Sequence, residues 1–263
     1  MVDLPLTLPD SLVPYEPSAS RELQLFGAPV ELALLPGRRL RAGAERRAQP
    51  PFQRSPAPRI IEEESYWRDG ALALTPNKFP FARDQRILWV TEPAREPDGV
   101  FWQAALKWVD RADGTVLLNN IGAAATIARA HAHLVGERLP FLELVREQPL
   151  TTAPIEPPAG CELIQKRLSR CVLGVRGPVA GRARALELLA DARTTATWNV
   201  VLTRDAAWVI PRAQQTPEPH LGCPMGAAEF WGRFCFVDEG PFAAANASTL
   251  GAAWEQAAAP AIG

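Results

Sequence analysis

The chain has 263 residues, of which 47% are hydrophobic and eight are tryptophan, so it can bury a sizeable core and is not disordered as a whole. Its 28 basic and 29 acidic residues give a formal net charge of -1, which offers no general attraction for nucleic acid or anionic membranes. No apolar run approaches the roughly 20 residues of a membrane-spanning helix, and no secretion signal is visible. We therefore expect a cytoplasmic protein with no nucleic-acid or membrane partner.

Residues 1–59 are expected to form an N-terminal extension that contains a basic, proline-rich loop. Residues 21–26 fit either a short helix or a strand, and residues 30–35 alternate before Pro36-Gly37, which is typical of a strand that ends in a turn. Residues 38–59 hold seven arginines and four prolines. This composition predicts a solvated loop, and the alternative is a basic loop that folds over an anionic ligand.

Residues 60–263 are expected to form the main domain, because short alternating runs predict strands and longer runs with helical spacing predict helices. The expected strands lie at residues 71–75, 86–91, 116–118, 131–135, 198–203 and 207–212. The expected helices lie at residues 97–111 (with Asp98 as its N-cap), 139–146, 181–193 and 250–259, and residues 227–236 form a helix or a strand. Strands joined by short turns, with helices inserted between them, favour an α+β fold around a mainly antiparallel sheet.

Two of the three histidines lie one residue apart in the segment His131-Ala132-His133-Leu134-Val135. This segment alternates, so in a strand both imidazoles project from the same face. Side by side, they can act as acid, base, nucleophile or metal ligand. The alternative is a pair of structural histidines. No glycine-rich dinucleotide fingerprint and no P-loop motif is present.

Four segments between about residues 70 and 237 match one family pattern in order and spacing. They are the turn 76–81 (Pro-Asn-Lys-Phe-Pro-Phe), the strand 86–92, the segment 120–124 (Asn-Ile-Gly-Ala-Ala) leading to the histidine pair, and the hairpin 198–212. The chain thereby resembles the histidine-triad (HIT-like) superfamily. It is most similar to the transferase branch, which contains galactose-1-phosphate uridylyltransferases and diadenosine tetraphosphate phosphorylases (ATP adenylyltransferases). The resemblance implies a HIT-like α+β domain.

The resemblance also implies an activity: a nucleotidyltransferase or phosphorylase that acts on a nucleoside polyphosphate or a nucleotide sugar. An imidazole attacks the α-phosphorus and holds the nucleotide as a nucleotidyl-histidine, which divides one difficult displacement into two easier ones. By resemblance His133 is the nucleophile, and His131 orients the loop. No cofactor is required beyond a divalent cation that accompanies the nucleotide, and a homodimer is expected. The implied substrate-binding residues are Asn77, Lys78, Asn120, Gly122, Arg129 and Asn199.

The sequence departs from the family pattern near the histidines. Two residues after the nucleophile the transferase branch carries Gln and the hydrolase branch His, whereas this chain has Val135, which cannot donate a hydrogen bond. Loss of one preorganised donor typically costs about 10²–10³ in rate. Either Arg129 or His220 supplies the missing donor, or the chemistry has changed, or the protein binds nucleotides without transferring them. A metal-dependent enzyme that uses His131, His133 and His220 is a further alternative, but no metal site is expected, because few of the spacings suit metal ligands.

Overall fold

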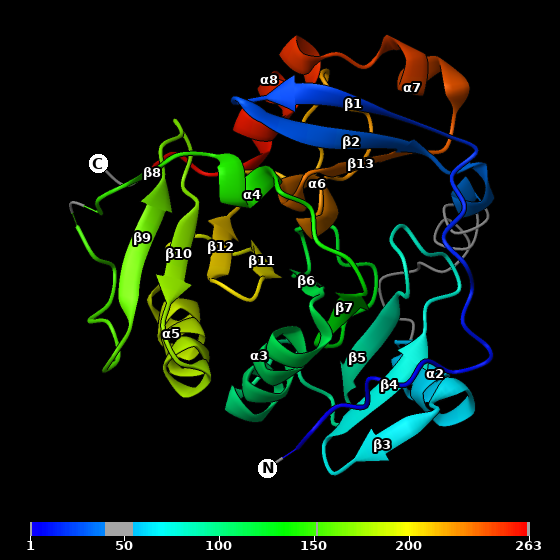
Figure 1. The fold of residues 1–263 in the computed structure, drawn as a ribbon, viewed down its shortest axis with the longest axis vertical. Helices are drawn as coiled ribbons and strands as arrows, with labels where there is room; N and C mark the ends of the chain where they lie inside the picture. Colours follow the sequence, from blue (N-terminus) through cyan, green and yellow to red (C-terminus); the bar gives the residue numbers. More distant parts are fainter. Residues whose placement is uncertain (1, 40–54, 151, 262–263) are drawn as a thin grey trace.

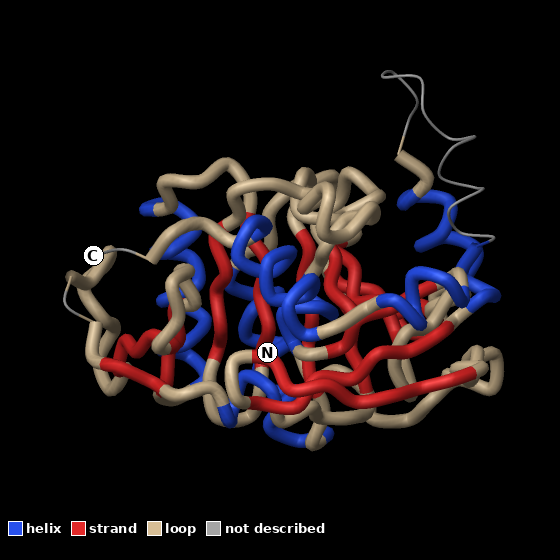
Figure 2. Tube along the Cα trace, turned by 90° about the horizontal axis from the view of Figure 1, so that it is seen from above, coloured by secondary structure: helices blue, strands red, loops and turns tan. Residues whose placement is uncertain are grey.

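The computed structural model describes residues 2–39, 55–150 and 152–261. Its framework is a ten-stranded sheet in which every neighbouring pair of strands is antiparallel (Figure 1). Seen from above, these strands stand side by side across the molecule (Figure 2). From one edge to the other they are β3 (Trp67–Asp69), β4 (Leu72–Pro76), β5 (Arg86–Val90), β7 (His131–Val135), β6 (Thr115–Asn119), β11 (Trp198–Leu202), β12 (Ala207–Pro211), β10 (Leu173–Arg176), β9 (Glu162–Lys166) and β8 (Glu147–Gln148).

A second, three-stranded sheet packs over one face of the large sheet (Figure 1), in the order β1 (Ala19–Leu25), β2 (Ala28–Leu34) and β13 (Arg233–Phe236). Strands β1 and β2 form an antiparallel hairpin, whereas β2 pairs in parallel with β13, which lies some 200 positions later in the chain. Two strands of the predicted N-terminal extension therefore share a sheet with the predicted main domain. The boundary at residue 59 stays a prediction, and residues 40–54 of the predicted basic loop lie outside the described residues.

Helices cover both sides of the large sheet. The described helical segments are η1 (Pro36–Arg38), α2 (Ala57–Glu64), α3 (Gly99–Ala112), α4 (Phe141–Leu144), α5 (Val179–Ala192), α6 (Ala227–Trp231), α7 (Glu239–Ala244) and α8 (Ala247–Ala257). Helices α3 and α5 pack together on one face, with side chains from alternate positions of β6, β7 and β11. The small sheet, α4, α6 and α8 cover the other face. In the described ranges no helix is long and apolar enough to cross a membrane.

The strand alternation places residues into these layers as the sequence predicts. In β6, Val116 and Leu118 contact the α3–α5 side, while Leu117 between them contacts the side of the small sheet. The helix that begins at Gly99 is capped by Asp98, whose side chain accepts a hydrogen bond from the Phe101 amide at 2.9 Å. The α+β fold class, this N-cap and the hairpin of β11 and β12 are confirmed. Residues 227–236 form both a helix and a strand.

Candidate active site

The two histidines lie on β7, in the middle part of the large sheet. Both project from the face opposite α3 and α5, as their alternation predicts, and they are 6% and 8% exposed for His131 and His133. Their ring centroids are 5.8 Å apart at an interplanar angle of 82°. The pair therefore lies at the junction of two apolar clusters, one around Trp89 and α2 and the other around Phe81 and the small sheet.

His131 is held by a backbone carbonyl just before β7 and by a tryptophan. Its Nδ1 lies 2.7 Å from the carbonyl oxygen of Arg129. Its ring stacks on Trp89, with centroids 4.8 Å apart and an interplanar angle of 26°. Trp89 is opposite His131 in the β5–β7 register and donates its indole N–H to Thr75 at 2.9 Å. The orientation of the His131 ring is thus set by buried neighbours on two strands.

His133 is fixed by a glutamine that precedes β5. The Gln85 Nε2 lies 2.9 Å from His133 Nδ1, and the Gln85 Oε1 accepts the backbone N–H of Phe81 at 2.7 Å. Gln85 is fully buried. The Phe81 ring meets the His133 ring edge-on at 5.4 Å, and the Arg38 guanidinium lies over the Phe81 ring at 5.2 Å. The turn 76–81 that carried part of the family resemblance is therefore in contact with the histidines.

The segment 120–124 is held by a buried polar cluster around Asn199. The Asn199 Nδ2 donates to the Asn119 Oδ1 at 2.8 Å and to the Ala123 carbonyl at 2.9 Å, and its Oδ1 accepts from Arg212. Arg212 also donates to the carbonyls of Met225 and Ala257. Burial lowers the pKa of Arg212 to about 10, although the nearby Glu229 acts in the opposite direction.

The predicted substrate-binding residues have different surroundings. The Asn77 Oδ1 accepts the Phe79 amide at 3.0 Å, and the Asn120 Nδ2 donates to Glu96 at 3.1 Å. Lys78, with 64% of its side chain exposed, is paired with Glu64 at 2.8 Å. Gly122 has a φ of +84°, a conformation that favours glycine. The buried Arg129 donates to the Thr91 carbonyl, and buried Asn199 has internal partners on both side-chain atoms.

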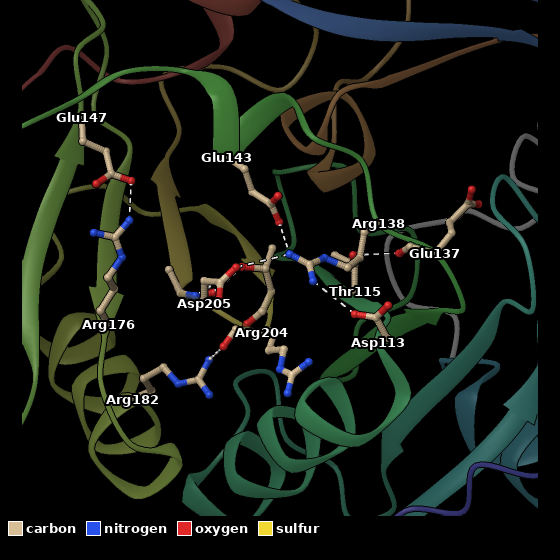
Figure 3. A network of polar contacts seen from close by, with 12 residues as sticks. Asp113, Thr115, Glu137, Arg138, Glu143, Glu147, Arg176, Arg182, Arg204 and Asp205 are labelled. Carbon is tan, nitrogen blue, oxygen red and sulfur yellow. Dashed lines mark hydrogen bonds and ion pairs between the residues drawn. The ribbon is translucent and has the colours of Figure 1, made fainter.

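A buried ion pair anchors the residue that leaves β7. Glu137 receives hydrogen bonds from Arg233 at 2.6 and 3.1 Å and from the Arg83 amide at 2.7 Å. Its backbone carbonyl accepts Thr115 Oγ1 at 2.9 Å (Figure 3). Burial acts to raise the pKa of Glu137, but the Arg233 guanidinium and the Arg83 groups outweigh it and hold that pKa below its usual value. Arg233 lies on β13 of the small sheet, where it also pairs with Glu31 on β2. Its pair with Glu137, which follows β7, therefore joins the large sheet to the small one.

The next residue, Arg138, forms the centre of a surface network (Figure 3). It pairs with Glu143 at 2.5 Å, with Asp113 at 3.1 Å and with Asp205 at 3.3 Å. These carboxylates come from the start of α4, the turn before β6 and the turn between β11 and β12. Helix α4 and two turns at one end of the sheet are therefore tied to the segment that follows the histidine strand.

We expect Glu137→Gln to lower the free energy of unfolding by about 1.5 kcal/mol at pH 7, because the charged acceptor of Arg233 is lost. A carboxyl with a lowered folded-state pKa stabilises the fold above its unfolded pKa of about 4.3, and this contribution disappears as pH falls through the folded pKa. The difference between wild type and variant should therefore shrink below about pH 4. Urea unfolding from pH 7 to pH 3.5 measures this difference in unfolding free energy. A difference that does not change with pH would contradict the prediction.

Several residues of the site were not predicted from the sequence: Gln85, Trp89, Phe81, Arg38 and Arg233. Gln85 and Trp89 could have been predicted from alternation, since the odd-numbered positions at and just before β5 lie on the same face of the sheet as the histidines. Arg38 and Arg233 reach the site from distant segments, and no local pattern marks them. His220, one of the alternative donors, is exposed in the turn after Pro217.

The part of the chain that the structure describes builds no metal centre around the histidine pair. Within residues 2–39, 55–150 and 152–261, no group of three His, Cys, Asp or Glu side chains is arranged to hold a metal ion. A surface cavity of about 740 Å³ lies between residues 155–159 and α5, and it includes none of the predicted site residues. The arrangement of the pair is that of two oriented imidazoles, suited to nucleophilic attack and hydrogen-bond donation.

Comparison with known proteins places the fold. No family profile matches the sequence, and no curated protein matches it. The crystal structure of yeast Ap4A phosphorylase Apa2 in complex with Ap4A is similar to this chain with a TM-score of 0.67 at 15% sequence identity, covering 96% of this chain and 93% of that one. Its complex with AMP gives a TM-score of 0.65 at 15% identity, covering 93% and 89%. The chain therefore has the fold of Ap4A phosphorylase, the α+β fold that its resemblance to the transferase branch of the histidine-triad superfamily predicted.

Proposed function

We propose that this chain is a nucleotidyltransferase or phosphorylase that acts on a nucleoside polyphosphate or a nucleotide sugar through a nucleotidyl-histidine intermediate. The observation that carries the proposal is the pair of imidazoles on β7, each held through Nδ1 by a neighbouring group. An imidazole held in this way has its Nε2 on the opposite side of the ring from its anchor. The fold similarity to an enzyme solved with Ap4A and with AMP supports a nucleotide as the ligand.

The reaction has two displacements at the α-phosphorus. In the first, an imidazole nitrogen forms an N–P bond while the P–O bond to the distal phosphate or sugar phosphate breaks, and the leaving oxygen keeps the electron pair. In the second, an oxygen of the acceptor (phosphate, a sugar phosphate or water) forms the new P–O bond and the N–P bond breaks. Hydrogen-bond donors must stabilise the charge on the phosphoryl oxygens in both steps.

A second candidate is a nucleotide-binding protein that does not transfer. Val135 is fully buried in the apolar core against the small sheet, so it contributes no polar group to a ligand. Arg129 and Asn199, two of the predicted substrate-binding residues, already have backbone or side-chain partners inside the protein. These two observations favour this candidate over an enzyme with the complete set of family donors.

Incubation with Ap4A or ADP-glucose, with and without inorganic phosphate, separates the two candidates. Ion-exchange chromatography measures turnover, and intact-protein mass spectrometry detects a nucleotidyl adduct. We expect wild type and His220→Asn to turn over and the double variant His131→Asn/His133→Asn to be inactive. Calorimetric binding without turnover selects the binding protein, and neither binding nor turnover contradicts both. The same assay with Mg²⁺ and with EDTA tests for a cation that arrives with the nucleotide.

A further inference from the structure

The hydrogen bond of His131 fixes the position of its proton. A backbone carbonyl oxygen can only accept, so the 2.7 Å contact between the Arg129 oxygen and His131 Nδ1 requires a proton on Nδ1. In the neutral ring the other nitrogen, Nε2, then has an unprotonated lone pair. His131 is therefore in the tautomer that attacks through Nε2.

The hydrogen bonds of His133 require the opposite tautomer. The backbone N–H of Phe81 can only donate, so the Gln85 side-chain atom at 2.7 Å from it is the oxygen. The Gln85 amide nitrogen then faces His133 Nδ1 at 2.9 Å and donates to it. Turning the amide over would place an NH₂ against the Phe81 N–H, and each buried group left unsatisfied costs about 1–3 kcal/mol. His133 Nδ1 is thus an acceptor, and its proton is on Nε2.

From this geometry we propose that His131, rather than His133, carries the attacking nitrogen, and that Gln85 holds His133 as a neutral hydrogen-bond donor. The proposal rests on the proposed transfer function. Nε2 of His131 forms the N–P bond, and the broken P–O bond leaves its electron pair on the leaving oxygen. The Nε2–H of His133 donates to a phosphoryl oxygen and keeps its proton in both steps, since a neutral imidazole that lost it would become an anion.

The surroundings of the two rings also differ in how well they stabilise a nucleotidyl-histidine. A nucleotidylated imidazole is a cation. Around His131, the Arg129 carbonyl accepts the Nδ1–H of that cation and the Trp89 ring stacks on its face, which adds a cation–π interaction. Around His133, the Gln85 N–H points its positive end at Nδ1. The positive charge is therefore stabilised on His131 and opposed on His133.

Gln85 acts as a positioning residue, and Gln85→Glu tests it without changing its shape. One carboxylate oxygen replaces Oε1 as the acceptor for Phe81, and the other can only accept from His133, so the proton of His133 should move to Nδ1. Nitrogen-15 spectra of histidine-labelled protein report the tautomers directly, and His→Asn variants assign the three histidines. Gln103→Glu, exposed on α3, is the matched control and should leave the spectra and the rate unchanged.

We expect the wild-type spectra to show a protonated Nδ1 on His131 and a protonated Nε2 on His133, with His133 reversed in Gln85→Glu. In single-turnover reactions with Ap4A, the adduct should map to His131. His133→Asn should form it about 10²–10³ times more slowly, and so should Gln85→Glu, because one donor is lost. An unprotonated Nε2 on wild-type His133, or an adduct on His133, would overturn the proposal. The tautomers are measured without a nucleotide. They therefore test the assignment of the two imidazoles separately from the proposed transfer function.

Discussion

Replacing Arg233 with alanine should lower the free energy of unfolding by about 3–5 kcal/mol, because removal of one partner leaves a charge buried without its counter-ion. Arg233 is 2% exposed and Glu137 is 7% exposed, and the two share a bidentate contact. Arg233 also donates to the Phe81 carbonyl at 3.1 Å and to Glu31. One substitution therefore weakens the joint between the two sheets and the loop that carries Phe81.

Urea unfolding followed by tryptophan fluorescence measures this loss. The control is Arg184→Ala, which breaks an exposed ion pair with Glu187 one helical turn away on α5 and should change the free energy by no more than about 0.5 kcal/mol. We also expect Arg233→Ala to lower transfer activity, because the Phe81 amide orients Gln85. A loss of stability below about 1 kcal/mol would show that the pair does not support the joint.

Replacing Asn199 with alanine should cost about 3 kcal/mol of unfolding free energy. The buried Ala123 carbonyl loses its donor and the buried Arg212 loses an acceptor, and each unsatisfied buried group costs about 1–3 kcal/mol. The prediction differs from the substrate-binding role implied by the resemblance. A residue that only contacts the nucleotide would change KM and leave stability unaltered.

Lys78→Ala provides the comparison for this test. Lys78 is exposed and paired with Glu64 at the surface, so its removal should change the unfolding free energy by less than about 1 kcal/mol. If Lys78 contacts phosphate, the variant should raise KM for the nucleotide. Equal stability of wild type and Asn199→Ala would contradict a structural role for Asn199, and KM measurements on the folded variants decide whether either residue binds the ligand.

The histidine pair shows how far alternation reaches. A two-residue period fixes the face of the sheet, so the sequence was sufficient to place His131 and His133 together. The period does not show which histidine is the nucleophile, because residues two positions apart in a strand lie on the same face. The distinction comes from the hydrogen bonds of Gln85 and Phe81, which lie in the loop between β4 and β5. If His133 were the nucleophile, the residue two positions later would be Val135, which cannot donate a hydrogen bond. If His131 is the nucleophile, the residue two positions later is His133, which can donate one.

Local patterns in the sequence determined six strands of the large sheet (β4, β5, β6, β7, β11 and β12), the Asp98 cap of α3 and the shared face of the histidines, because each depends on periodicity or on groups only a few residues apart. Only the tertiary structure decided that β2 pairs with β13 and that Arg233 meets Glu137, because these partners are separated by about 200 and by 96 positions in the chain. Hydrogen bonds and ion pairs of that range depend on where the packed layers bring their ends together, and no short-range pattern encodes that meeting.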